Sequence, residues 1–422
     1  MIHPDREGRG SSRAPEARLE EAIGLAEALD LDVRESLVAS LRKLTPATLF
    51  GKGKVEEIAA TVRAVEADVV IVDDALTPVQ QRNLEKAWDA KVIDRTGLIL
   101  EIFARRARTR EGRLQVELAR LTYERSRLVR TWTHLERQRG GFGVMGGPGE
   151  TQIETDRRLI SEKITKLKKE LVEVRRTRTL QRSGRKRVPY PTVALVGYTN
   201  AGKSTLFNRL THAEVVAEDM LFATLDPTLR ALKLPDGRPA ILSDTMGFIS
   251  DLPHELVEAF RATLEEVQEA DVVLHVRDIA SEESQAQAAD VRTVLERLGV
   301  DMDERRILEV WNKVDLLPQE DRGDLAGDAR RAHPPAIPVS AVTGEGADEL
   351  LRAVSALVDE APPVDVYAPA GEGAAIAWLY RHGRVVERND GKDGSVRLAV
   401  SLSPQALGQF EQLFPQAEVR AH

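Results

Sequence analysis

The stretch Thr192-Val-Ala-Leu-Val-Gly-Tyr-Thr-Asn-Ala-Gly-Lys203-Ser204 decides the fold of this 422-residue chain. Its first five residues form an apolar run that is typical of a short buried strand. The pattern G-x-x-x-x-G-K-S follows from Gly197 to Ser204, and residues 205–210 continue as a predicted helix. A strand, a glycine-rich loop and a helix in this order predict a phosphate-binding P-loop in a mostly parallel α/β sheet.

Each residue type in this loop has a chemical task. Glycines let backbone N–H groups wrap around phosphates, and the following helix presents its positive end to them. Lys203 is predicted to neutralise the β- and γ-phosphates, and Ser204 Oγ to bind Mg²⁺. The whole loop is expected to contact a nucleotide: Gly197, Tyr198, Thr199, Asn200, Ala201, Gly202, Lys203 and Ser204.

The motif Asn312-Lys313-Val314-Asp315 indicates which base is bound. An aspartate at position 315 can accept from both N1–H and the 2-amino group of guanine, as a bidentate charge-assisted pair. Adenine lacks these donors and leaves the carboxylate unpaired, at a cost of about 1–3 kcal/mol. We therefore predict a guanine site, in which Lys313 lies along the base and Asn312 ties the neighbouring loops together.

A last nucleotide loop is predicted after the apolar run 336–339. It consists of Ser340, Ala341 and Val342, and the Ala341 backbone N–H is expected to point at the guanine oxygen. The Ser-Ala pair is common in proteins, so this prediction depends on the order of the motifs along the chain.

Two segments between these motifs are predicted to be nucleotide-sensitive switches. Asp244-Thr245-Met246-Gly247 follows the apolar run 240–242; Asp244 is expected to hold Mg²⁺ through water, and the Gly247 N–H to contact the γ-phosphate. In the upstream segment 221–228, one threonine should close onto Mg²⁺ in the triphosphate state. Thr224 is our choice and Thr228 the alternative. The accompanying predicted nucleotide contacts are Phe222, Ala223, Leu225 and Asp226.

Phe248 stands where many GTPases place a water-orienting glutamine. Because phenylalanine neither donates to nor accepts from water, we expect slow intrinsic GTP hydrolysis. The missing group must come from a backbone, a monovalent cation or a partner. Asn200 is a candidate ligand for K⁺, since related GTPases with asparagine there use potassium; a local turn hydrogen bond by Asn200 is the alternative.

Composition limits the class of protein. The chain has no cysteine, which excludes disulfides and thiolate metal sites. Its polar start lacks the apolar core of a secretory signal, and no stretch of about 18 apolar residues predicts a membrane span. We therefore expect a cytoplasmic protein. We also expect it to be a monomer.

Charge is distributed unevenly along the chain. The net charge is −8, but residues 101–190 hold 24 Lys and Arg against 11 Asp and Glu, so the remainder carries −21. Such asymmetry is the pattern of a polyanion-binding segment on acidic domains, or of a long solvated helix with mixed charges.

The basic segment is predicted to be a helical arm. Residues 110–138 as one helix extend roughly 43 Å, at about 1.5 Å per residue. Two apolar seams predict an antiparallel coiled pair with a glycine-rich tip at residues 140–149. The seams are Leu114, Leu118, Leu121, Leu128, Trp132 and Leu135, and then Ile160, Ile164, Leu167, Leu171 and Val174.

The complete prediction is an α/β protein of four parts. An N-terminal α/β subdomain (1–105) follows a loose start and carries the arm (106–188). The GTPase domain (189–361) has a mostly parallel sheet with helices on both faces. A small α+β domain (362–422) follows, read as helix, hairpin and helix.

These residues together resemble the HflX family of ribosome-associated GTPases over nearly the whole chain. Besides the nucleotide motifs, the likeness includes residues 51–57, 93–97, 115–119 and 146–157. The resemblance implies a GTPase that binds the large (50S) ribosomal subunit and splits stalled 70S ribosomes under stress such as heat. In that family the arm and its tip reach toward the peptidyl-transferase centre.

Two alternatives stay open. A non-ribosomal GTPase switch could use the arm as a protein-binding coiled coil. Some family members have been assigned ATPase or RNA-remodelling activity in the N-terminal domain; Gly51-Lys-Gly-Lys54 lacks P-loop spacing, however, and a tight strand-to-helix turn is the better interpretation.

Overall fold

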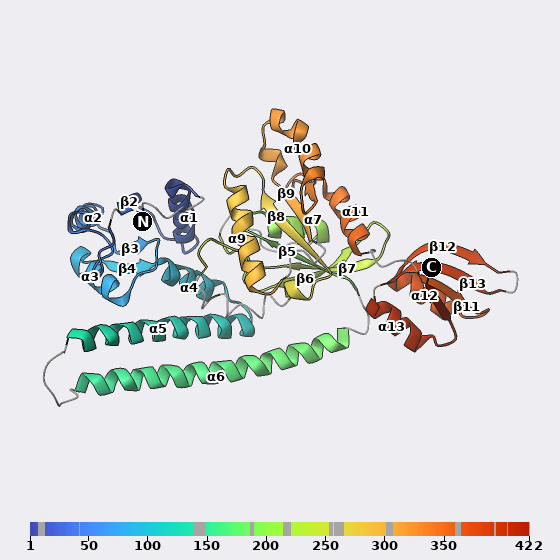
Figure 1. Ribbon diagram of the computed structural model, residues 1–422, viewed down its shortest axis with the longest axis horizontal. Helices are drawn as coiled ribbons and strands as arrows, with labels where there is room; N and C mark the ends of the chain where they lie inside the picture. The colour runs from blue at the N-terminus through green and yellow to red at the C-terminus, as the bar shows by residue number, and fades with distance from the viewer. Residues whose placement is uncertain are drawn as a thin grey trace. The chain divides into compact units, whose positions relative to one another are not determined.

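Figure 1 shows the computed structural model of the chain. It describes residues 1–6, 13–41, 43–138, 148–185, 190–213, 221–252, 256, 266–300, 307–358, 364–391, 394–402 and 404–421. The chain divides into two compact units. The first comprises Met1–Arg176, Glu218–Asp226 and Ile249–Ala262, and the second comprises Thr177–Ala217, Pro227–Phe248 and Thr263–His422.

The first unit is built on a four-stranded parallel sheet of order β2-β1-β3-β4. Its strands are β1 (Ile2–Arg6), β2 (Leu37–Leu41), β3 (Val69–Val72) and β4 (Lys91–Asp94). Its helices are α1 (Pro15–Glu27), α2 (Lys52–Ala64), α3 (Pro78–Trp88) and α4 (Arg95–Arg106). The predicted loose start is wrong for β1: these polar residues become a strand because they pair with both β2 and β3.

Local chemistry explains where these helices begin. Thr77 caps α3 in a capping box with Gln80, and Pro78 occupies the first turn, where its missing N–H costs nothing. Helix α2 begins at Lys52 behind Gly51, after a turn over residues 45–50. Gly51–Lys54 is thus a helix start, and a turn of several residues separates it from β2.

Two long helices follow, α5 (Arg110–Gln138) and α6 (Pro148–Arg185). Helix α5 packs on α3 and α4. Its buried side chains include Gln115, Val116, Ala119 and the predicted seam residue Leu121, whereas the seam residues Leu114 and Leu118 are half-buried. Pairing of α5 with α6 stays a prediction. The glycine-rich tip lies outside the described residues, apart from the last two, which begin α6.

The second unit contains a six-stranded sheet of order β10-β9-β8-β5-β7-β6, parallel except for the β6–β7 pair. Its strands are β5 (Thr192–Gly197), β6 (Thr228–Lys233), β7 (Pro239–Asp244), β8 (Val272–Asp278), β9 (Ile307–Asn312) and β10 (Ala336–Pro338). Its helices are α7 (Lys203–Thr211), α9 (Ser284–Arg297), the short η1 (Val314–Leu316), α10 (Gln319–Arg331) and α11 (Ala347–Val358).

Helices lie on both faces of this sheet (Figure 1), which confirms the predicted P-loop GTPase fold. Leu274, Val276, Leu308 and Val310 share one apolar core with α7 and α11. Because successive side chains of a strand point to opposite faces, the residues between them face α9 and α10. That face includes buried polar side chains, among them His275, Arg277 and Glu309.

The C-terminal domain contains a third sheet, of order β12-β13-β11-β14. It runs β11 (Val364–Ala368), α12 (Gly373–His382), β12 (Arg384–Asp390), β13 (Val396–Ser401), α13 (Pro404–Leu413) and β14 (Glu418–Ala421). The predicted helices and hairpin are present, but the prediction missed β11 and β14. Strand β11 pairs with β13 of the hairpin, and β14 pairs with β11. Within the described parts of the chain, no helix is long and apolar enough to cross a membrane. The predicted domain boundaries stay predictions.

Candidate nucleotide-binding site

The P-loop connects β5 to α7 through positions that only glycine can occupy. Gly202 has φ +87, and a Cβ there would lie 2.2 Å from Asn312 Nδ2. A Cβ on Gly197 would lie 2.2 Å from the Val276 carbonyl oxygen on the neighbouring strand. These contacts hold the loop backbone against β8 and against the guanine motif, with α7 starting directly behind it.

Lys203 is buried at the centre of the loop, 6% exposed. Its Nζ donates to the carbonyl oxygens of Gly197 at 3.2 Å and Tyr198 at 2.7 Å. Burial lowers the pKa of Lys203 to about 8, partly offset by the Asp244 charge. A phosphate close to Nζ would supply the negative charge that this buried ammonium lacks.

Ser204 and Asp244 meet beside this lysine. Ser204 Oγ donates to Asp244 Oδ2 at 2.7 Å, and Asp244 at the end of β7 is fully buried. A hydroxyl and a carboxylate are the hard oxygen donors that Mg²⁺ accepts, with phosphates and water completing its shell. The pair therefore fits the predicted Mg²⁺ site: Ser204 would be a direct ligand, and Asp244 would act through water. When bound, the ion supplies charge neutralisation at the phosphates.

The segment after Asp244 runs along the P-loop. Thr245 Oγ1 donates to the Leu195 carbonyl oxygen at 2.6 Å, and Met246 is buried. A Cβ on Gly247 would lie 3.0 Å from Lys203 Nζ and 2.8 Å from Thr199 Cα, so only glycine brings this backbone so close to the lysine. The predicted contact of its N–H with a γ-phosphate agrees with this position and stays a prediction.

Phe248 has a structural role that the sequence did not indicate. Its N–H donates to Gly197 at 3.1 Å, and its carbonyl accepts from the Thr199 N–H at 2.7 Å. The ring is fully buried. The Phe248 backbone therefore fastens the segment to the P-loop strand, and the side chain is part of the protein core.

The guanine motif is held by its asparagine, as expected. Asn312 Nδ2 donates to the Ala201 carbonyl at 2.8 Å, and Asn312 Oδ1 accepts from the Ala341 N–H at 3.0 Å. One side chain thus ties the P-loop to the last loop. The Ala341 N–H already donates to Asn312. It could contact a guanine oxygen, as predicted, only if this N–H donates to both acceptors.

Asp315 is placed by a local bend in the chain. Lys313 has φ +67, and its Nζ pairs with Asp278 Oδ2 at 2.8 Å. The short helix η1 follows and carries Val314 and Asp315. The Asp315 carboxylate is half-exposed and makes no hydrogen bond to the residues that the structure describes, which leaves both oxygens for a base. In the last loop Ser340 is buried, and Val342 is 66% exposed.

The predicted switch I segment belongs to the first compact unit, up to Asp226. There the ring of Phe222 packs edge-on against Phe103, with centroids 4.7 Å apart. The Asp226 carboxylate accepts from the N–H groups of Arg108 and Thr109, directly before α5, at 2.9 Å each, and Thr109 Oγ1 in turn caps the helix by accepting from the Gly112 N–H at 2.9 Å. Two residues predicted to contact nucleotide are therefore engaged by the arm and its neighbour.

The other residues of this segment keep their predicted roles as predictions. Ala223 and Thr224 are half-buried, and Leu225 is buried. The alternative, Thr228, begins β6 in the second unit and pairs with Asp244 across the β6–β7 ladder. The structure therefore does not decide between Thr224 and Thr228.

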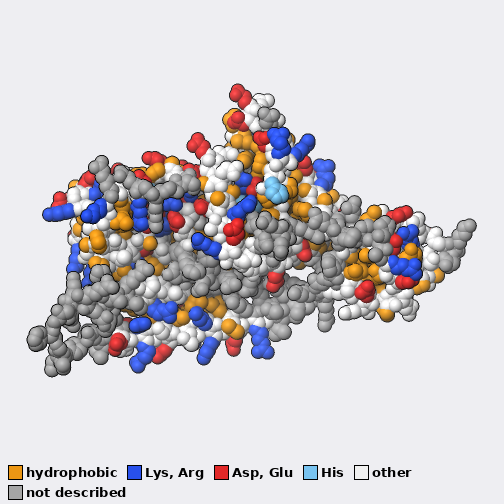
Figure 2. Space-filling model, in the orientation of Figure 1, with side chains coloured by type: hydrophobic (Ala, Val, Ile, Leu, Met, Phe, Trp, Pro, Cys, Tyr) orange, Lys and Arg blue, Asp and Glu red, His pale blue; other side chains and the backbone are white. Residues whose placement is uncertain are grey.

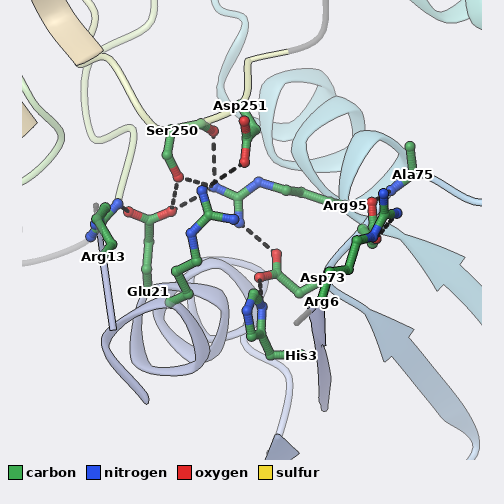
Figure 3. A network of polar contacts seen from close by, with 11 residues as sticks. His3, Arg6, Arg13, Glu21, Asp73, Ala75, Arg95, Ser250 and Asp251 are labelled. Atoms are coloured by element: carbon green, nitrogen blue, oxygen red, sulfur yellow. Dashed lines mark hydrogen bonds and ion pairs between the residues drawn. The ribbon is translucent and has the colours of Figure 1, made fainter. Parts of the chain in front are cut away.

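The segment after Phe248 also belongs to the first unit, where Figure 3 shows its polar contacts. Arg95, at the start of α4 and 7% exposed, donates to Ser250 O at 3.0 Å and Ser250 Oγ at 3.1 Å. The same guanidinium pairs with Glu21 and Asp73, at 2.5 Å each. His3 Nδ1 lies 2.8 Å from the second oxygen of Asp73. No sequence motif indicated this cluster.

Asn200, the candidate potassium ligand, occupies a left-handed position with φ +59. Asparagine tolerates this conformation, which is a structural reason for its presence. Its exposed side chain makes no hydrogen bond to described residues, so the alternative local turn bond is not observed.

A glycine-rich loop, a buried lysine, a hydroxyl–carboxylate pair and a guanine motif tied to them define a P-loop GTPase. Sequence models of protein families match the chain in four consecutive stretches: GTP-binding GTPase N-terminal (16–104), GTP-binding GTPase Middle Region (106–185), 50S ribosome-binding GTPase (192–313) and HflX C-terminal domain (327–420). The chain belongs to the HflX GTPase family, and it binds and hydrolyses GTP.

Known relatives agree with this assignment. GTPase HflX of Magnetococcus marinus is 55% identical over 394 residues, covering 93% of this chain and 90% of that protein. GTPase HflX of Escherichia coli is 45% identical over 389 residues, covering 91% and 89%. Among solved structures, the crystal structure of SsGBP and GDP complex is 25% identical with TM-score 0.48, covering 85% of this chain and 98% of that chain.

Proposed function

We propose that this GTPase is a cytoplasmic monomer that binds the large ribosomal subunit in its GTP state and splits stalled 70S ribosomes under stress. The proposal is supported by the matched family, which is described as ribosome-binding. It rests on one observation of the molecule: α6 exposes seven lysines and arginines between residues 154 and 176, along a helix that does not need them for its own core. Exposed cations spaced along a helix are suited to RNA phosphates.

The geometry suggests how nucleotide state reaches the arm. Asp226, two residues after Thr224, accepts from the N–H groups of Arg108 and Thr109, directly before α5. Ser250, three residues after Gly247, is held by Arg95. Closure of either switch on GTP and Mg²⁺ pulls on one of these anchors, so GTP favours the ribosome-bound arrangement and hydrolysis releases it.

Co-sedimentation tests the proposal. The full-length protein is pelleted with purified large subunits in the presence of GDP or a non-hydrolysable GTP analogue, and we expect pelleting only with the analogue. Replacing Lys166, Lys168 and Lys169 with glutamine should weaken binding and reduce the salt dependence, by roughly 0.7–0.9 in log–log slope per lost phosphate contact. The matched control replaces Lys43, Lys52 and Lys86, which lie off the arm.

Splitting itself needs a separate measurement. Light scattering of 70S ribosomes should fall when the protein and GTP are added, and the large subunit should accelerate GTP hydrolysis because Phe248 cannot orient water. No nucleotide-dependent pelleting would remove the ribosomal proposal, and unchanged hydrolysis would mean that the chain itself replaces the missing group.

A second candidate is favoured by two apolar residues on the same helix. Leu159 is 47% exposed and Val172 is 63% exposed. Such residues suit a protein-binding helix in a non-ribosomal switch. Replacing both with serine should leave ribosome pelleting unchanged if RNA is the partner, and should abolish partner binding if a protein is.

We also propose K⁺ as an activator, held by Asn200. Hydrolysis in KCl should exceed hydrolysis in NaCl at equal ionic strength, and Asn200→Ala should remove the difference. Equal rates of the parent protein in the two salts would contradict this role.

A further inference from the structure

A pocket of about 490 Å³ lies between α9 and α10, over strands β8 and β9. Its floor is made by His275, Arg277, Glu309 and Trp311, which all lie on the sheet face opposite the apolar core of α7 and α11. Parallel strands covered on both faces are normally apolar on both. A histidine, an arginine and a glutamate in the middle of such a sheet are therefore not explained by packing.

The pocket exists because α9 turns small residues toward it. Ala288 and Ala289 line the pocket, and Arg292 follows one turn later on the same side of the helix. Alanines leave a hollow that larger apolar side chains would fill. Figure 2 shows a histidine and several basic side chains on the visible surface of the molecule. The rim of the pocket is polar, because the exposed lining residues include Arg292, Asp328, Arg331 and His333.

The carboxylates of this pocket already have partners. Glu309 Oε2 accepts from Arg277 Nη1 at 2.6 Å and from Trp311 Nε1 at 2.8 Å. Asp328, at the rim, pairs with Arg331 at 2.7 Å. The acidic groups are therefore engaged by two arginines and an indole, and they offer little to a cationic ligand.

Two cationic groups keep unused donors. Arg277 is 6% exposed, and its Nε has no hydrogen-bond partner in the described structure. Arg292 is exposed and forms no hydrogen bond or ion pair with the residues described. Leaving a buried donor without an acceptor is unfavourable, so binding of an anion that accepts from it is favoured.

His275 on the pocket floor is a neutral donor and acceptor. Burial is the main reason why the pKa of His275 falls to about 4; the Glu309 charge opposes this shift, and the charges of Arg277, Arg292 and Lys203 add to it. His275 is therefore neutral at pH 7, with one nitrogen able to donate and one to accept.

We propose that this pocket is a second ligand site, which binds a small phosphorylated molecule between Arg277 and Arg292. Its volume lies within the range of small-molecule sites, about 300–1,000 Å³. Planar guanidinium groups match phosphate oxygens in geometry and charge.

The position of the pocket gives this site a consequence. Arg277 directly precedes Asp278, the partner of Lys313, and Trp311 directly precedes Asn312. A ligand that contacts Arg277 and Trp311 therefore lies next to the ends of β8 and β9, where Asp278 and the predicted guanine motif begin. Binding of this ligand is expected to change the affinity for GDP, and by thermodynamic linkage GDP must change the affinity for the ligand by the same factor.

The test uses inorganic pyrophosphate and the full-length protein saturated with GDP, so that the P-loop is already occupied. Isothermal titration should show one saturable site per chain. Arg292→Ala should weaken binding about tenfold or more, since a charge-assisted hydrogen bond is lost. Arg297→Ala is the matched control: it is an exposed arginine on the same helix, outside the pocket.

A second variant keeps the charges and fills the space. Ala289→Trp, at an exposed helix position, should abolish pyrophosphate binding while the protein still binds GDP. Absence of saturable binding to the GDP-loaded parent would overturn the proposal. Equal losses in Arg292→Ala and Arg297→Ala, or unchanged binding in Ala289→Trp, would also overturn it, because binding would then be non-specific or elsewhere.

Discussion

Arg95 Nη2 donates to the backbone carbonyl oxygen of Ser250 at 3.0 Å, and the two residues are 155 positions apart in the chain. Ser250 also donates to Glu21 Oε1 at 2.8 Å, so both of its polar groups are bound in the first compact unit. Ser250 lies three residues beyond Gly247, so this anchor fixes the chain close to the predicted γ-phosphate contact. The nucleotide site and the N-terminal unit are thereby connected through the chain itself.

The anchor predicts a large loss of stability when Arg95 is removed. Arg95→Met leaves the Asp73 carboxylate, 4% exposed, without its guanidinium partner, and leaves Glu21, 6% exposed, with Arg13 as its remaining cation. Breaking a buried ion pair in this way costs about 3–5 kcal/mol in free energy of unfolding. Urea denaturation at pH 7 measures it. Arg105→Met, which removes an exposed pair with Asp30, should cost under about 1 kcal/mol; equal losses would contradict the role of Arg95.

The contact between Asp226 and the start of the arm is expected to be sensitive to one methyl group. A Cβ on Gly112 would lie 2.4 Å from Asp226 Oδ1, so Gly112→Ala should push the carboxylate away from the N–H groups of Arg108 and Thr109. Loss of such a hydrogen bond costs about 0.5–1.5 kcal/mol. Hydrogen exchange of residues 108–112 should accelerate by a corresponding factor, with Gly53→Ala, at an open helical position, as the neutral control. Unchanged exchange would show that Asp226 does not hold the arm.

Phe248→Gln is expected to destabilise the protein without activating it. The ring is fully buried, so an amide at this position lies in the core and cannot reach a water at the γ-phosphate. We expect a loss of roughly 3–5 kcal/mol, as for large core truncations, and no rise in single-turnover hydrolysis. Phe248→Leu should cost less and leave hydrolysis unchanged. Faster hydrolysis in the glutamine variant would place this side chain in the site after all.

The affinity for GTP should fall as pH rises above about 8. The pKa of Lys203 is about 8 in the described structure because burial penalises its charge, and bound phosphates will raise it. Below pH 8 the lysine is protonated in both states, so affinity is flat; above pH 8 binding must take up a proton, and affinity falls up to tenfold per unit. Calorimetry at pH 9 in buffers of different ionisation enthalpy should detect this proton uptake. A flat profile from pH 7 to 9 would contradict it.

Asp315→Asn should weaken guanine-nucleotide binding selectively. The variant loses the negative charge that accepts from the N1–H and 2-amino donors of guanine. Its amide group also turns a donor toward one of these two donors, so the affinity for GDP should fall about 10- to 100-fold or more. Fluorescence titration with labelled GDP measures the loss. Asp321→Asn, an exposed aspartate at the start of α10, serves as the control, and equal affinity in both variants would refute base recognition by Asp315.

The parts of the fold that could be predicted are those whose backbone conformation is set by neighbouring residues in the chain. The strand β5, the P-loop and the start of α7 follow from one apolar run and the spacing of Gly197, Gly202 and Lys203. Helix α3 follows from Thr77 and Pro78. In each case a few neighbouring residues determine the backbone, so no knowledge of distant partners is needed.

Other elements depend on partners that are distant in sequence. Strand β1 is polar and short, and it is a strand because β2 and β3 bind both its edges. Strand β11 is bound on both edges, by β13 and β14, and β14 is a strand because it pairs with β11. On α5 the buried side includes Leu121 of the predicted seam, but it also takes in Gln115 and Val116, because α3 and α4 pack on the helix.

The sequence by itself determined the class of chemistry, through a phosphate loop and a guanine motif that are each specified by residue type and spacing. Only the tertiary structure decided that Phe248 is a core residue, that Asp226 and Ser250 are anchored by the N-terminal unit, and that His275, Arg277 and Glu309 line a pocket. The reason is physical. Backbone conformation is set by neighbours in the chain, whereas burial and ion pairing are set by neighbours in space.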